Sequence, residues 1–105
     1  MAQLESSYTD IPNKLLDRII KTNFTGAEIQ ILIFIIRFTY GEDKKSNQLS
    51  LEFISEGTGI DKRYISNSLS SLTKDKVVLV TGIQADSRGK EIKINNNYEQ
   101  WRARR

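Results

Sequence analysis

Two residue types that build many catalytic and metal sites are missing from this chain: its 105 residues include no cysteine and no histidine. Without thiols the chain can form no disulfide, no thiolate metal site and no cysteine nucleophile. Without imidazoles it lacks a common zinc ligand and the most frequent general base. The sequence also shows no phosphate-binding glycine loop and no metal-ligand spacing. We therefore expect a protein that is not an enzyme and uses no metal ion or other cofactor.

Long apolar runs are absent as well. The longest run covers residues 31–36, whereas a helix that spans a membrane needs about 20 apolar residues. The first residues, Met-Ala-Gln-Leu-Glu-Ser-Ser, have neither the positive region nor the apolar region of a signal peptide. These features predict a cytoplasmic protein that does not contact a membrane.

Charge is distributed unevenly along the chain. The net charge is only +3. Residues 1–57 carry six Lys and Arg against eight Asp and Glu, whereas residues 58–105 carry ten against five. A scattered excess of this size would indicate only a soluble surface. Its concentration in one half of the chain predicts a polyanionic partner.

Apolar spacing and capping residues predict four helices, over residues 12–21, 28–40, 51–57 and 62–74. A capping box, Thr25 with Glu28, precedes the second helix, and Gly41 is expected to end it. The third helix should stop at Gly57-Thr58-Gly59, and Asp61 should cap the fourth.

Three strands complete the predicted elements. Residues 48–49 could form a short strand, while residues 77–81 and 91–94 read as a hairpin that leans on the helices. The expected fold class is α+β, mainly α: a winged helix-turn-helix with an additional N-terminal helix and a C-terminal two-stranded wing. We expect residues 1–7 to be a disordered or extended N-terminus, residues 8–97 to be a winged-helix DNA-binding domain, and residues 98–105 to be a basic C-terminal tail.

The fourth predicted helix has one apolar and one polar face. At 100° per residue, Ile65, Leu69 and Leu72 share the apolar face, and the opposite face gathers the following side chains: Arg63, Asn67, Ser70 and Lys74, with Ser66 at its margin. Arg can bind guanine and Asn can bind adenine through paired hydrogen bonds. The polar face could equally be an ordinary solvated helix surface.

Arg63 and Asn67 are the predicted base-reading residues, because they lie in the half of the helix that usually enters the major groove. Other predicted contacts on this helix are a tyrosine and two serines that could reach bases or phosphates, and two lysines near its ends that could bind phosphates. In chain order these are Lys62, Tyr64, Ser66, Ser70 and Lys74. Arg88 and Lys90, at the hairpin tip, are predicted to contact a phosphate or a minor groove.

Several blocks of the sequence resemble the N-terminal domain of the bacteriophage replication protein O family, which organises replisomes at origins. The resemblance runs from Tyr8 to Val80. Its most specific parts are the Ile-Pro-Asn-x-Leu-Leu start, the Ile-Arg-x-Thr-Tyr-Gly block and a pair of lysines. The residues that carry it are 8–16, Thr25, Glu28, 35–41, Lys44, Lys45, 49–51 and 58–61.

This resemblance implies a winged-helix domain that binds repeated sites at a replication origin in a bacterial host. It also implies DNA contacts by Lys44 and Lys45, and recruitment of the replicative helicase through its loader. Glu42 stands where the family pattern has an aromatic residue. Members of the family continue beyond this length into a region implicated in loader contact. The chain is therefore expected to be either an excised domain or a short relative that only binds DNA, and a loader contact is expected only of a longer native chain.

The sequence leaves three functions open. The first is sequence-specific binding of double-stranded DNA at repeated origin sites, by a homodimer or by several copies on adjacent sites. The second is a winged-helix transcriptional repressor that binds an operator, because the same fold and face would serve it. The third is a winged helix that binds only other proteins through its apolar helices.

Overall fold

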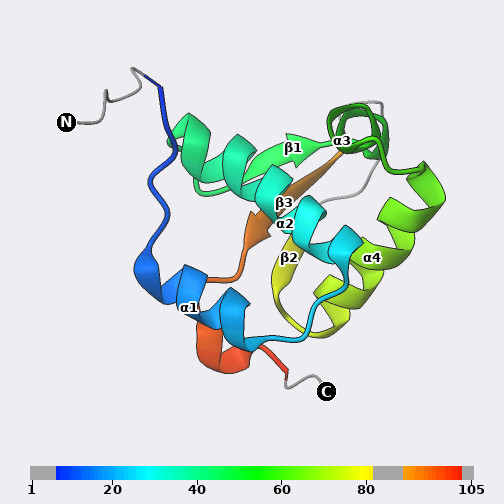
Figure 1. Ribbon diagram of the computed structural model, residues 1–105. Coiled ribbons are helices and arrows are strands. Elements are labelled where there is room, and N and C mark those ends of the chain that lie inside the picture. Colours follow the sequence, from blue (N-terminus) through cyan, green and yellow to red (C-terminus); the bar gives the residue numbers. More distant parts are fainter. Residues whose placement is uncertain (1–6, 82–88, 103–105) are drawn as a thin grey trace.

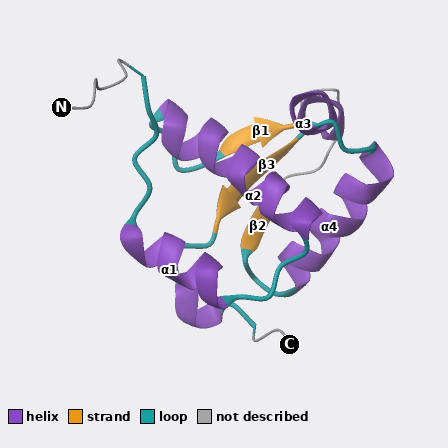
Figure 2. Cartoon of the chain, in the orientation of Figure 1, coloured by secondary structure: helices purple, strands orange, loops and turns teal. Residues whose placement is uncertain are grey.

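The structure is a computed structural model that describes residues 7–81 and 89–102. Its helices and strands follow one another in the predicted order. Figures 1 and 2 show α2 crossing in front of the sheet, between α1 and α4. The elements are α1 (Asn13–Lys21), α2 (Gly26–Thr39), β1 (Asn47–Leu49), α3 (Leu51–Thr58), α4 (Lys62–Lys74), β2 (Val78–Thr81) and β3 (Lys90–Ile94), with 3-10 turns at Tyr40–Glu42 and Tyr98–Gln100. The predicted class, α+β and mainly α, is confirmed.

The three strands form one antiparallel sheet in the order β1-β3-β2. Val78 pairs with Ile94 and Val80 with Ile92 in the hairpin, while β1 adds to the other edge of β3. The short predicted strand is thus real, and it widens the expected two-stranded wing to three strands. The residues between β2 and β3, 82–88, lie outside the described part. The order of elements agrees with a winged helix, and the specific assignment to that fold stays a prediction.

Local capping signals behave as the sequence predicts. Thr25 accepts a hydrogen bond from the Glu28 backbone N–H, and the Glu28 carboxylate accepts one from the Thr25 N–H. Ser50 caps α3 through the Phe53 N–H at 3.0 Å. Asp61 caps α4 through the Arg63 N–H at 2.9 Å. Each side chain therefore satisfies an N–H group that would otherwise lack a partner at a helix start.

The predicted role of Gly41 as the end of the second helix is wrong. α2 ends at Thr39, the chain continues through a 3-10 turn, and the left-handed residue is Asp43, with φ 57°. Gly41 instead allows a close approach: a Cβ atom there would lie 2.7 Å from the Thr9 hydroxyl oxygen. The N-terminal segment can pack against this turn because the side chain is missing.

The third helix ends within the predicted Gly57-Thr58-Gly59 stretch. α3 continues through Gly57 to Thr58, and Gly59, with φ 77°, forms its left-handed C-cap. Gly57 lies under the Phe34 ring of α2, where a Cβ atom would come within 2.2 Å of Cε2. Close contact between α2 and α3 therefore depends on this glycine.

The hydrophobic core forms where α2 meets the sheet and the other helices. Ile31, Leu32 and Ile35 of α2 are buried, but Ile33 is 60% exposed. Phe53 of α3 is 41% exposed and lies at the edge of an aromatic cluster with Phe34. α2 is thus central to the core and leaves one apolar side uncovered.

The C-terminal segment folds back onto α1 and the core. Trp101 is 4% exposed and meets the rings of Phe24 and Tyr98 edge to face. Its indole N–H donates to the Asn95 carbonyl at 2.8 Å, and the Arg18 guanidinium lies over its ring. Trp101 therefore packs as part of the body of the protein.

Candidate nucleic-acid interface

The polar face of α4 is open to solvent. All seven residues predicted to contact DNA from this helix are exposed, while Ile65 and Leu72 on the opposite face are buried. The helix has no carboxylate between its N-cap, Asp61, and its last residue, Lys74. We call its exposed side the α4 strip: Lys62, Arg63, Tyr64, Ser66, Asn67, Ser70 and Lys74.

Two of the cations on the α4 strip are paired with acids. Lys62 Nζ lies 3.6 Å from a Glu52 carboxylate oxygen, and Arg63 Nε lies 3.7 Å from Asp61 Oδ1. The side chains of Lys62 and Arg63 are 57% and 86% exposed, and ion pairs between exposed groups contribute little to stability. Both cations can therefore exchange these acids for phosphates or base edges at small cost.

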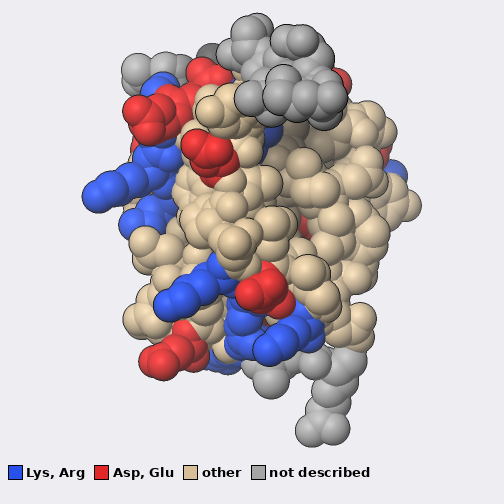
Figure 3. All heavy atoms as spheres, turned by 60° about the vertical axis from the view of Figure 1, so that its left-hand side comes forward, with Lys and Arg blue, Asp and Glu red and all other residues tan. Residues whose placement is uncertain are grey.

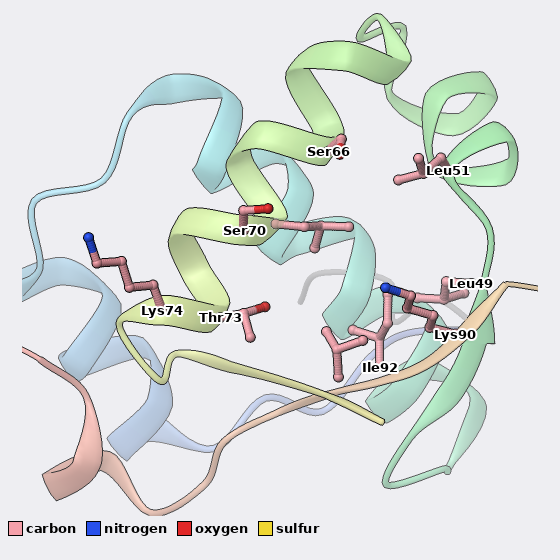
Figure 4. A pocket seen from close by; sticks show the side chains of 10 residues that line it. Leu49, Leu51, Ser66, Ser70, Thr73, Lys74, Lys90 and Ile92 are labelled. Atoms are coloured by element: carbon pink, nitrogen blue, oxygen red, sulfur yellow. The ribbon is translucent and has the colours of Figure 1, made fainter. Parts of the chain in front are cut away.

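A groove of about 560 Å³ runs between α4 and the sheet (Figure 4). Two lysines and three hydroxyl side chains contribute to its wall, its floor is apolar, and none of its lining residues is a carboxylate. Figure 4 shows Lys90 and Ile92 of β3 across the groove from Ser66, Ser70 and Thr73 of α4. The lining residues are Leu49, Leu51, Ser66, Leu69, Ser70, Thr73, Lys74, Val80, Lys90 and Ile92.

The groove joins residues that are far apart in the sequence. Lys90, predicted as a hairpin contact, shares the groove with Lys74. Thr73 was not predicted, although its spacing of three residues from Ser70 and seven from Ser66 places it on the same side of a helix. Arg88, the other predicted hairpin contact, lies outside the described residues.

Lys44 and Lys45 are exposed but lie apart from the α4 strip. They line a second hollow with Tyr8, Tyr40 and other residues of the N-terminal segment and the 3-10 turn. In Figure 1 this turn is at the left of the molecule and α4 at the right. Burial raises the pKa of Tyr40, and the Tyr98 phenol raises it further. Lys44 and Lys45 can contact the same duplex as α4 only if that duplex follows the surface around the protein.

The face shown in Figure 3, which brings the left-hand side of Figure 1 forward, carries both signs of charge. Lys and Arg side chains lie beside Asp and Glu side chains there, so neither sign dominates. The α4 strip differs, because its own helix contributes cations and no acid after the cap. Among the described residues, no group of acids could hold a metal ion, and no helix is long and apolar enough to cross a membrane.

Comparison with known proteins identifies relatives along nearly the whole chain. The sequence is 28% identical over 101 residues to Replication protein 15 of Enterobacteria phage phi80, covering 96% of this chain and 32% of that protein. It is 25% identical over 104 residues to DNA replication protein gp18 of Salmonella phage P22, covering 99% of this chain and 36% of that protein. The chain thus spans about a third of the length of these curated relatives.

A sequence profile of one family, described as bacteriophage replication protein O, matches residues 1–101. This match covers the α4 strip, the groove and Trp101, and it agrees with the resemblance seen in the sequence. The chain belongs to the bacteriophage replication protein O family.

Proposed function

We propose that this chain binds double-stranded DNA sequence-specifically, at repeated sites in a phage replication origin, and thereby helps to start replication in the bacterial host cytoplasm. The observation that carries the proposal is the α4 strip: an exposed helix face of guanidinium, amide, hydroxyl and ammonium groups without a carboxylate. Membership of a replication protein family supports the setting. The two relatives are also named as replication proteins.

Arg63 and Asn67 are proposed to read bases from the major groove. Both lie in the first half of α4, where a recognition helix usually contacts base edges. A good paired contact of Arg with guanine or of Asn with adenine discriminates against the wrong base by about 1–3 kcal/mol. The exposed Arg63 side chain, 86% accessible, is free to make such a contact without a large desolvation of existing partners.

The groove between α4 and the sheet is proposed to hold one sugar-phosphate strand. Lys74 and Lys90 can bind phosphates, and Ser66, Ser70 and Thr73 can donate hydrogen bonds to phosphate oxygens. The apolar floor suits the deoxyribose carbons. These contacts fix the position of α4 on the duplex but carry no sequence information.

One such domain makes a modest interface with DNA. A single module of this kind buries on the order of 600–1,000 Å², so useful specificity requires a homodimer or several copies on adjacent sites. Contact with a helicase loader is proposed only for a longer protein that contains this domain.

Two substitutions test the proposal in complementary ways. Arg63→Ala should relax preference at one base position by roughly tenfold and leave the salt dependence nearly unchanged. Lys74→Ala should weaken specific and random duplexes alike and reduce the slope of log affinity against log salt by about 0.9. The measurement is duplex affinity by fluorescence anisotropy from 50 to 200 mM salt, with sites selected from a random-sequence pool.

Asn23→Ala is a suitable control, because this exposed residue lies between α1 and α2 rather than on α4. If neither α4 variant differs from the control on either kind of duplex, α4 is not the reading element. Mapping the bound sites on the source genome separates the two DNA-binding functions. Iterated repeats within an origin support the replication role, whereas a single palindrome over a promoter supports a repressor.

A further inference from the structure

The turn after α4 holds a lysine in a backbone conformation that favours glycine. Lys76 has φ 63°, and its N–H donates to the Thr73 carbonyl at 3.1 Å while the Val77 N–H donates to the Leu72 carbonyl at 2.9 Å. This pair of bonds is the Schellman ending of a helix, in which the left-handed position is usually Gly. A side chain at that position brings Cβ close to the following carbonyl oxygen. The lysine therefore occupies a place where glycine would be less strained.

Buried groups of the C-terminal segment hold this turn in place. The Asn95 amide donates to the Lys76 carbonyl at 2.8 Å, and the Asn95 N–H donates to the Val77 carbonyl at 3.0 Å. Asn95 is 3% exposed, and its own carbonyl accepts the Trp101 indole N–H. The backbone of Lys76 is thus fixed by the core and not by a mobile loop.

The same segment brings a second cation to the end of α4. The Arg102 backbone N–H donates to the Asp75 carbonyl at 2.8 Å, directly after Lys74, the last residue of the helix. Lys74, Lys76 and Arg102 are all exposed. The neighbouring acids are Asp75, which is partly buried and has an interaction within the protein, and the exposed Glu99 of the 3-10 turn.

We propose that Lys76, with Lys74 and Arg102, forms a phosphate-binding site for the DNA backbone at the C-terminal end of α4. The site rests on the proposed function and extends it, because it adds Lys76 and Arg102 to the backbone contact already proposed for Lys74. The end of a recognition helix contacts backbone phosphates in other helix-turn-helix domains. Phosphate binding supplies a reason for a lysine where the fold alone favours glycine.

A competing explanation is that Lys76 only complements the partial negative charge at the end of α4. The two explanations predict opposite outcomes for Lys76→Gly. If the lysine binds phosphate, the variant should melt at the same temperature or higher, because glycine suits the left-handed position. For a random-sequence duplex, the slope of log affinity against log salt should nevertheless be reduced by about 0.9. This change corresponds to roughly eightfold weaker binding at 0.1 M salt.

Two matched variants complete the experiment. Lys76→Arg keeps the charge and should keep the wild-type slope. Lys14→Gln removes one exposed charge at the start of α1 and should also leave the slope unchanged. Arg102→Gln should reduce the slope by a similar amount to Lys76→Gly, since it removes another member of the same site.

Two results would overturn this site. In the first, the salt slope of Lys76→Gly equals that of Lys14→Gln. In the second, Lys76→Gly melts at a lower temperature than the wild type and binds DNA as the wild type does. Either result, found while Arg63→Ala still loses base preference, leaves the proposed function intact and removes only the phosphate site. A wild-type chain that retains no duplex at 50 mM salt removes both.

Discussion

Replacing Trp101 with Ala should cost a large part of the stability of this domain. The side chain is 4% exposed, its indole N–H bonds the Asn95 carbonyl at 2.8 Å, and it touches Phe24 and Tyr98 at ring-centroid distances of 6.2 and 5.6 Å. Truncating a buried Trp to Ala costs about 3–5 kcal/mol. Within that sum the hydrogen bond contributes about 1 kcal/mol, and each edge-to-face pair about 0.5–1.5 kcal/mol.

Urea unfolding followed by circular dichroism measures this cost. With an m value near 1.3 kcal/mol/M, which is ordinary for a domain of about 100 residues, the Trp101→Ala midpoint should fall by about 2–4 M. Trp101→Phe keeps an aromatic ring but leaves the buried Asn95 carbonyl without its donor, so its midpoint should fall by only about 1 M. The variant Arg102→Ala, at an exposed neighbour, serves as the control and should unfold close to the wild type.

A Trp101→Ala midpoint within about 0.5 M of the wild type would refute the reasoning. Such a result would mean that the segment after β3 adds little to the core. The sequence-based division, with a domain that ends at residue 97 and a basic tail, makes the same assumption. If Trp101→Ala and Trp101→Phe lowered the urea midpoint by the same large amount, most of the stabilisation would come from the hydrogen bond to Asn95.

Two further predictions concern packing and pH. Gly57→Ala should lower the free energy of unfolding by about 1–2 kcal/mol, because its Cβ would lie 2.2 Å from the Phe34 ring and overpacking outweighs the gain in helix propensity. Gly26→Ala should not destabilise the protein in the same urea assay, because a Cβ atom at Gly26 would meet nothing within 4 Å. Equal unfolding midpoints for Gly57→Ala and Gly26→Ala would contradict the packing argument. Burial, and then Tyr98, raises the pKa of Tyr40 above its usual 10.0. Folding therefore favours the neutral phenol. This contribution to stability is complete below pH 10 and is lost as the pH rises through the folded-state pKa. Tyr40→Phe should therefore flatten the loss of stability above pH 10, and an unchanged pH profile would argue against it.

Much of the fold follows from local patterns in the sequence. The Thr25-Glu28 capping box and the Ser50 and Asp61 caps involve residues at most three positions apart, so the sequence alone predicts them. Where the prediction was wrong, a distant residue decided the outcome. Gly41 does not end the second helix but lies in a 3-10 turn beside Thr9 of the N-terminal segment.

The candidate site shows the same division. The α4 strip follows from the period of the helix, since Ile65 and Leu72 must face the core and leave Arg63 and Asn67 in solvent. Thr73 could have been added from the same period. The groove could not be predicted, because it exists only where α4 packs against the sheet.

The sequence by itself determined the order of elements, the caps and the polar face of α4, because these depend on side chains within a few turns of one another. The tertiary structure alone decided that Lys90 and Ser66 line one groove, that Lys44 and Lys45 lie elsewhere, and that Trp101 packs onto α1. It also decided that Arg102 sits beside the end of α4. Such contacts join segments tens of residues apart, and only the packing of one shared core brings those segments together.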